Sequence, residues 1–107
     1  MAVDAVFGQH LLLPPAIPSP VLVECMTGDP GRDTPVQRFV NTCTVVEVVP
    51  MRIAKRAAWL RSRAGRGSAV DAIVVAMAEP DGIVMTTDIG DIRALAASSN
   101  GVTVERI

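Results

Sequence analysis

The sequence predicts one α/β domain in which a parallel sheet is covered by helices on both faces, a three-layer arrangement. Its 107 residues suffice for a single hydrophobic core and are too few for two. Half of the residues are apolar and 20% are charged, a balance typical of folded rather than disordered chains. Short β-branched runs alternate with segments of helical spacing, and parallel strands require such helical crossovers. Residues 1–107 are therefore expected to form one domain.

The first half of the chain predicts two strands and two helices. The apolar run 11–13 stops at two prolines and indicates a short buried strand. Ser19-Pro20 supplies an N-cap and a proline at the first helical position, so we expect a helix over 19–28. A second helix begins at Asp33, again with a proline close behind. The β-branched run 44–49, closed by a proline, predicts the next strand.

The second half predicts three helices and two strands. Residues 52–64 place apolar side chains on one face and basic side chains around the rest, which predicts an amphipathic helix. Residues 68–79 are apolar nearly all round, so this helix should be buried on most sides. Residues 83–87 predict a strand and 88–99 a helix. A final strand, 102–107, follows an Asn-Gly turn.

The net charge of -1 hides an uneven distribution. Most of the basic residues lie in one stretch that contains no Asp or Glu, while the rest of the chain is acidic. The members of this basic stretch are Arg52, Lys55, Arg56, Arg61, Arg63 and Arg66. The stretch can be a solvated helix face or a surface that contacts the phosphates of a nucleic acid.

The cysteines and the apolar runs bear on the cellular compartment. Cys25 and Cys43 form neither a C-x-x-C motif nor a dense disulfide framework. The N-terminal residues lack a basic segment followed by a continuous apolar run, and no such run approaches the ~20 residues of a membrane span. We therefore expect a cytoplasmic protein with reduced thiols and no membrane contact.

Four carboxylates in apolar surroundings are candidates for a functional site. Glu24 interrupts an apolar run, Asp71 is the only charge among residues 68–78, and Asp88 and Asp91 follow the strand 83–87. The carboxyl ends of parallel strands and the N-termini of helices share one sheet edge, so these acids can converge. Several carboxylates in one pocket require a cation, which indicates Mg²⁺ or Mn²⁺. Such ions can activate water for hydrolysis of a phosphodiester.

Helix capping explains the same acids without any chemistry. Residues 68–71 and 88–91 each fit a capping box, in which a side chain bonds to free amides at a helix start. Glu24 can simply face water. One carboxylate can cap a helix and bind a metal, so both interpretations stay open. Other catalytic arrangements have little support, because the chain holds one histidine, His10, and no Gly-rich phosphate loop.

Several segments of the sequence resemble a known family. Residues 68–76, residues 83–95 and the closing run 102–104 look like the C-terminal half of a PIN domain. Residues 18–24 are similar to the helix that carries the second acid of that family. The resemblance is to the VapC-like ribonuclease toxins of type II toxin–antitoxin modules, and it covers most of the chain from residue 11 onward.

This resemblance implies a metal-dependent endoribonuclease. By position, Glu24, Asp71 and Asp88 resemble the second, third and fourth acids that hold Mg²⁺ or Mn²⁺. Asp91 resembles an accessory acid, and Thr86 resembles the hydroxyl residue near the metal. The resemblance further implies RNA as the substrate, with phosphates against the basic stretch, and a cognate antitoxin that inserts a segment into the groove.

The N-terminal residues depart from the family pattern. Family members begin with a strand that carries the first acid, followed by a helix, before the strand that matches 11–13. Only three residues separate Phe7 from Leu11, and a parallel crossover needs a dozen or more. We therefore expect that Asp4 is not the first acid and that residues 1–10 are the remnant of a helix. The fold would then be PIN-like without its first strand and helix.

Three functional hypotheses follow from the sequence. The first is an endoribonuclease toxin that cleaves RNA slowly or not at all, because one metal-binding acid is missing. The second is a non-catalytic PIN remnant that binds an antitoxin. The third is a structural α/β module whose carboxylates are only helix caps. Because the missing strand is central in the family, we also expect unpaired sheet edges that recruit a second copy or the antitoxin.

Overall fold

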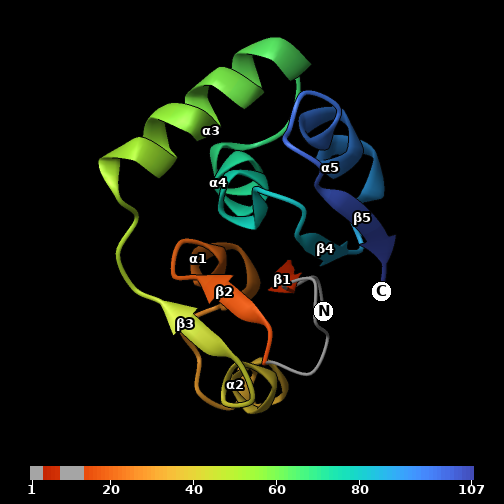
Figure 1. Ribbon diagram of the computed structural model, residues 1–107. Helices are drawn as coiled ribbons and strands as arrows, with labels where there is room; N and C mark the ends of the chain where they lie inside the picture. Colours follow the sequence, from red (N-terminus) through yellow and green to blue (C-terminus); the bar gives the residue numbers. More distant parts are fainter. Residues whose placement is uncertain (1–3, 8–13) are drawn as a thin grey trace.

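A mixed sheet with helices packed against it makes up the computed structural model, which describes residues 4–7 and 14–107 (Figure 1). Within these residues the sheet has five strands and the chain forms five helices. The strands are β1 (Ala5–Phe7), β2 (Ala16–Pro18), β3 (Thr44–Val46), β4 (Ile83–Thr86) and β5 (Thr103–Arg106). The helices are α1 (Val21–Cys25), α2 (Thr34–Val40), α3 (Met51–Ala64), α4 (Ala69–Ala78) and α5 (Ile89–Ala96).

The strand order is β3-β2-β1-β4-β5, with β1 at the centre. The pairs β2–β3 and β4–β5 are parallel, as expected for strands joined through helices. β1 is antiparallel to both of its neighbours, with Val6 opposite Ala16 on one side and Val84 on the other. The α/β class is confirmed, whereas the prediction of a wholly parallel sheet is wrong.

β1 also corrects two expectations about the N-terminus. Ala5–Phe7 form a strand and not the end of a helix. This strand fills the centre of the sheet, so the gap that was expected to expose unpaired backbone edges between β2 and β4 does not exist. Residues 1–3 and 8–10, and the strand predicted over 11–13, lie outside the described residues.

The core lies between the sheet and α4. This helix contacts β1, β2 and β4 and also packs against α3 and α5, as Figure 1 shows. Val74 and Val75 are fully buried in α4, and Ile17 and Val84 are fully buried in the strands beneath it. The prediction that this apolar helix is buried on most sides is confirmed.

Local signals explain where the helices end. α3 is capped at its C-terminus by Gly65, which adopts a left-handed conformation with φ of 67° and donates its N–H to the Arg61 carbonyl. α1 ends at Cys25, three residues before the predicted boundary, because the following backbone amides bond elsewhere. No helix within 4–7 and 14–107 combines the length and apolar character needed to cross a membrane.

Candidate metal centre

Three aspartates converge where α4 and α5 begin. Asp71 lies in the first turn of α4, while Asp88 precedes α5 and Asp91 lies in its first turn. One carboxylate oxygen from each lies within 4.8 Å of the others. Asp71 is buried, Asp91 is half-buried and Asp88 is exposed, so the group opens to solvent on one side. The sequence predicted all three of these positions.

Asp4 joins this group from the central strand. The register that places Ala5 opposite Met85 brings the preceding residue to the end of β4. There the Thr86 hydroxyl donates a hydrogen bond of 2.7 Å to Asp4 Oδ1 and accepts one of 2.9 Å from the Asp88 backbone N–H. Thr86 is fully buried, so its hydroxyl holds a fixed position between the two acids.

The expectation that Asp4 lies outside the site is therefore wrong. A parallel first strand would need a long crossover, and the sequence provides only a short one. An antiparallel β1 needs none, and it presents its N-terminal end at the sheet edge where β2 and β4 present their carboxyl ends. The signal available in the sequence was an acid directly before the β-capable run Ala5–Phe7.

Glu24 completes the acidic lining from α1. A cavity of about 290 Å³ is lined by five carboxylate residues together with Val21 and Ser68. We call this the acidic cavity, and its acids are Asp4, Glu24, Asp71, Asp88 and Asp91. Glu24 itself is exposed, so it lies toward the mouth. Desolvation by the surrounding protein, followed by the charges of Asp71 and Asp88, raises the pKa of Glu24 above its ordinary value.

The electrostatics of the acidic cavity disfavour full ionisation. Desolvation raises the pKa of Asp71 to about 6, helped by a hydrogen bond with the Asp4 carboxyl and by its charge. Hydrogen bonds from Ser68 oppose this rise of the pKa without cancelling it. A cation would stabilise the ionised carboxylates, and an all-oxygen donor set suits Mg²⁺ or Mn²⁺. The residues present therefore fit the metal that the sequence predicts.

Helix capping accounts for only part of the arrangement. The Ser68 hydroxyl accepts a hydrogen bond of 3.0 Å from the Asp71 N–H, so the predicted cap at α4 forms. Asp88 occupies the N-cap position of α5, but among the described residues its side chain makes no capping bond. The second predicted capping box is therefore wrong, which leaves the Asp88 carboxylate free to serve another purpose.

The basic stretch divides into paired and unpaired cations. Arg56 donates two hydrogen bonds of 2.8 Å to Glu79, and Arg66 donates one of 2.6 Å to Asp91. Arg61 donates to the Gly67 carbonyl. Within the described part of the chain, Arg52, Lys55 and Arg63 have no carboxylate partner. Part of the stretch thus has a structural role, and contact of its six side chains with a nucleic acid stays a prediction.

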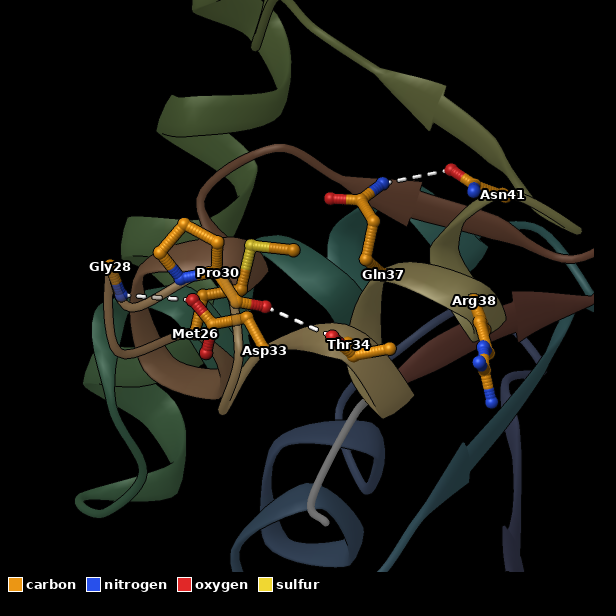
Figure 2. A pocket seen from close by; sticks show the side chains of 8 residues that line it. All are labelled: Met26, Gly28, Pro30, Asp33, Thr34, Gln37, Arg38 and Asn41. Atoms are coloured by element: carbon orange, nitrogen blue, oxygen red, sulfur yellow. Dashed lines mark hydrogen bonds between the residues drawn. The ribbon is translucent and has the colours of Figure 1, made fainter.

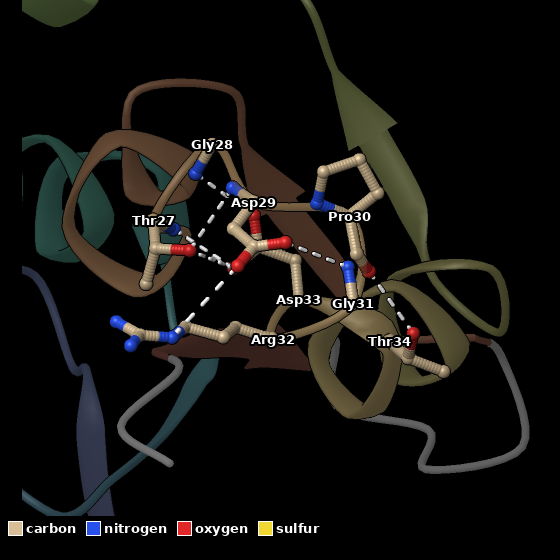
Figure 3. Close-up of polar contacts among 8 residues, drawn as sticks. All are labelled: Thr27, Gly28, Asp29, Pro30, Gly31, Arg32, Asp33 and Thr34. Carbon is tan, nitrogen blue, oxygen red and sulfur yellow. Dashed lines mark hydrogen bonds and ion pairs between the residues drawn. The ribbon is translucent and has the colours of Figure 1, made fainter.

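A larger cavity of about 380 Å³ lies beside α2 (Figure 2). Among the described residues that line it, Asp33 has the only buried polar side chain, and it accepts hydrogen bonds from Thr27 N, Thr27 Oγ1 and Gly28 N (Figure 3). These bonds lower the pKa of Asp33. The carboxylate is satisfied by the loop it organises, so its role there is structural.

Comparisons with protein-family models, with curated proteins and with solved structures find no match to this chain. The functional argument therefore rests on the acidic cavity itself.

Proposed function

We propose that this chain is an endoribonuclease that uses Mg²⁺ or Mn²⁺ in the acidic cavity. The observation that carries this proposal is the convergence of five carboxylates, from the start of β1, from α1, from α4 and from the start of α5, in one cavity of about 290 Å³. Folding brings these acids together and raises the pKa of Asp71 to about 6. At neutral pH the ionised Asp71 therefore lowers the stability of the native state unless a bound ligand offsets this loss. Cation binding is the compensation that suits these donors.

Each residue of the acidic cavity has a distinct task in this proposal. Asp71, Asp88 and Asp91 would hold the cation, since their oxygens already lie within 4.8 Å of one another. When bound, the cation would polarise water and stabilise a leaving phosphodiester oxygen. Thr86 orients Asp4 through a hydrogen bond of 2.7 Å. Glu24 at the mouth is placed to accept a proton from a water molecule entering with the substrate.

A PIN-like, VapC-like assignment accompanies this function. Support comes from Glu24, Asp71 and Asp88, the three acids that the resemblance identifies, which line one cavity. Further support comes from the short strand β1 at the sheet centre, where the family also has a strand. The reversed direction of β1 departs from the family pattern. We propose a three-layer PIN-like domain, acting in the cytoplasm, whose partners are RNA and an antitoxin that blocks the groove.

One contact favours the non-catalytic alternative. Arg66 Nε lies 2.6 Å from Asp91 Oδ1, so a guanidinium already neutralises one acid of the cavity. A cation must compete with Arg66 for Asp91 or bind without it. If Arg66 stays bound to Asp91 and no cation binds, the acidic cavity would serve to bind an antitoxin and the chain would not cleave RNA.

Metal binding and cleavage test the proposal together. Calorimetry with Mn²⁺ should show one or two sites in the parent protein and an affinity lower by about tenfold or more in Asp71→Asn. Asp81→Asn removes an exposed carboxylate outside the cavity and serves as the matched control. RNA cleavage with Mn²⁺ should disappear in Asp88→Asn. Equal Mn²⁺ binding by Asp71→Asn and the parent would contradict the metal site and restore the capping interpretation.

A further inference from the structure

Trp59 lies on the outer face of α3 and is 45% exposed. It is the only tryptophan of the chain. The guanidinium of Arg56 lies 4.5 Å from the centre of its ring, and that of Arg63 lies 5.4 Å from it. A large aromatic ring with two guanidinium groups over it is thus exposed at the surface, and it does not serve as a core residue.

Basic residues flank Trp59 along one face of α3. Arg52, Lys55, Arg56 and Arg63 precede or follow it at the spacing of one helical face. The opposite face of α3 carries the buried Ala57 and Leu60, which pack toward the neighbouring helices. Because its apolar face is already used inside the molecule, α3 cannot insert into a lipid surface. The exposed face is cationic with one aromatic ring.

The two arginines beside Trp59 differ in freedom. Arg56 is fixed by the two hydrogen bonds to Glu79, and its guanidinium therefore backs the ring as a permanent neighbour. Arg63 is exposed and takes part in no hydrogen bond or ion pair with residues 4–7 or 14–107. It can leave the ring without breaking a hydrogen bond or an ion pair with these residues. A flat group can therefore reach Trp59 while Arg63 turns to a nearby anion.

We infer that Trp59 and Arg63 form a stacking platform for an unpaired base of single-stranded RNA, with Lys55 and Arg52 against the adjoining phosphates. Base stacking on an exposed aromatic ring and phosphate contacts from flanking cations are the two components of such binding. An acidic protein would use the cations but gives no reason for a ring held between them. The identity of RNA as the ligand rests on the proposed function.

The C-terminal end of α3 connects the platform to the acidic cavity. Trp59 precedes the last residue of α3 by five residues, about 7.5 Å along the helix axis. Just beyond that end, Arg66 contacts Asp91 at the cavity. An RNA strand that stacks a base on Trp59 can therefore continue toward the carboxylates.

The emission of Trp59 reports on this contact without a label. Oligouridylate titrated into the parent protein in EDTA at low salt should quench that emission, in step with the anisotropy of a labelled strand. A blunt duplex of the same length should quench less, because its bases are already stacked. Poly-glutamate should not quench. Binding of oligouridylate that leaves the emission unchanged, absence of binding, or equal quenching by poly-glutamate would each overturn the platform.

Variants identify the residues. Trp59→Ala should weaken binding of labelled oligouridylate by about tenfold. Met51→Ala, which truncates another exposed apolar side chain of α3, should not weaken it. Arg63→Gln should lower the dependence of affinity on salt more than Arg38→Gln, which removes an equal charge from α2. Trp59→Ala binding as tightly as the parent would contradict the inference.

The metal-free conditions keep this test separate from that of the acidic cavity. Stacking on Trp59 in EDTA together with no Mn²⁺ binding would overturn the proposed hydrolysis and leave the platform. Mn²⁺-dependent cleavage that Trp59→Ala does not affect, together with an unchanged emission, would overturn the platform and leave the hydrolysis.

Discussion

At the scale of single residues, Asp71 couples the chemistry of the acidic cavity to the stability of the fold. Its pKa rises from 3.8 to about 6 on folding. The native state therefore binds the proton more tightly than the unfolded chain does. The contribution of Asp71 to the free energy of unfolding is fully present below pH 4 and is lost as the pH rises through 6. The full difference corresponds to at most about 3 kcal/mol.

We therefore expect Asp71→Asn to stabilise the protein when no metal is present. In EDTA at pH 7.5 the variant should exceed the parent by about 1–2 kcal/mol in the free energy of unfolding, and the gain should vanish near pH 4. Chemical unfolding at the two pH values measures this difference. Mn²⁺ should then stabilise the parent more than the variant. An equal or lower stability of Asp71→Asn at pH 7.5 would contradict the high pKa.

Arg66 offers a second test at this scale. Its guanidinium lies 2.6 Å from Asp91 and occupies a carboxylate that the cation would use. Arg66→Gln removes this competitor and should tighten Mn²⁺ binding by about two- to fivefold, the range of a partly exposed ion pair. Arg61→Gln, which affects only a bond to the Gly67 carbonyl, is the control. Weaker Mn²⁺ binding in Arg66→Gln would show that Arg66 supports the site.

At the scale of elements, patterns in the sequence predicted most helices and strands from α2 onward. Proline positions, β-branched runs and the apolar character of α4 act locally, so they can be read without tertiary contacts. The end of α1 could not be predicted in this way, because the Asp33 carboxylate accepts hydrogen bonds from the backbone amides of Thr27 and Gly28. The partners of Arg56 were equally hidden, since Glu79 lies 23 residues away. Contacts across such distances depend on the fold.

The bond between Arg56 and Glu79 fastens α3 to the end of α4. Glu79 accepts two hydrogen bonds from Arg56 and one from the Asn100 N–H, and its side chain is nearly buried. These contacts lower the pKa of Glu79, so their contribution is present at neutral pH and is lost as the pH falls. We expect Glu79→Gln to lower the free energy of unfolding by about 1–3 kcal/mol at pH 7.

Chemical unfolding checks this expectation, with Glu47→Gln as the control because Glu47 is exposed. The loss in Glu79→Gln should shrink as the pH is lowered toward 3.5, because a carboxylate with a lowered pKa contributes progressively less stability below the ordinary pKa of glutamate. A loss that persists unchanged at that pH would point to packing instead of the ion pair.

At the scale of the whole molecule, the direction of β1 decides both the sheet and the site. Nothing in a run of three residues indicates whether a strand is parallel or antiparallel, since that depends on which neighbours it meets. The family pattern favoured a missing central strand, and the structure instead fills the centre with a reversed one. This reversal carries Asp4 to the carboxylates, so a topological feature supplies the acid that the sequence interpretation left out.

Two neighbouring residues of this segment separate stability from chemistry. Ala5 is 1% exposed at the centre of the sheet, whereas Asp4 lines the acidic cavity. Ala5→Asp would bury a carboxylate without a partner, at a cost of several kcal/mol against a total stability of about 5–15 kcal/mol. We expect this variant to lose cooperative thermal unfolding. Asp4→Asn keeps an oxygen that can accept from the Thr86 hydroxyl and removes one charge beside Asp71, so it should fold and melt at or above the parent temperature.

The same pair predicts opposite outcomes for the metal. Asp4→Asn should weaken Mn²⁺ binding and slow RNA cleavage while retaining a sharp thermal transition, because one carboxylate is lost from an intact cavity. Circular dichroism melting and calorimetry on both variants measure the two effects separately. If Ala5→Asp melted like the parent, β1 could not be the central strand. If Asp4→Asn bound Mn²⁺ and cleaved RNA as the parent does, the reversed strand would complete the sheet without contributing to the site.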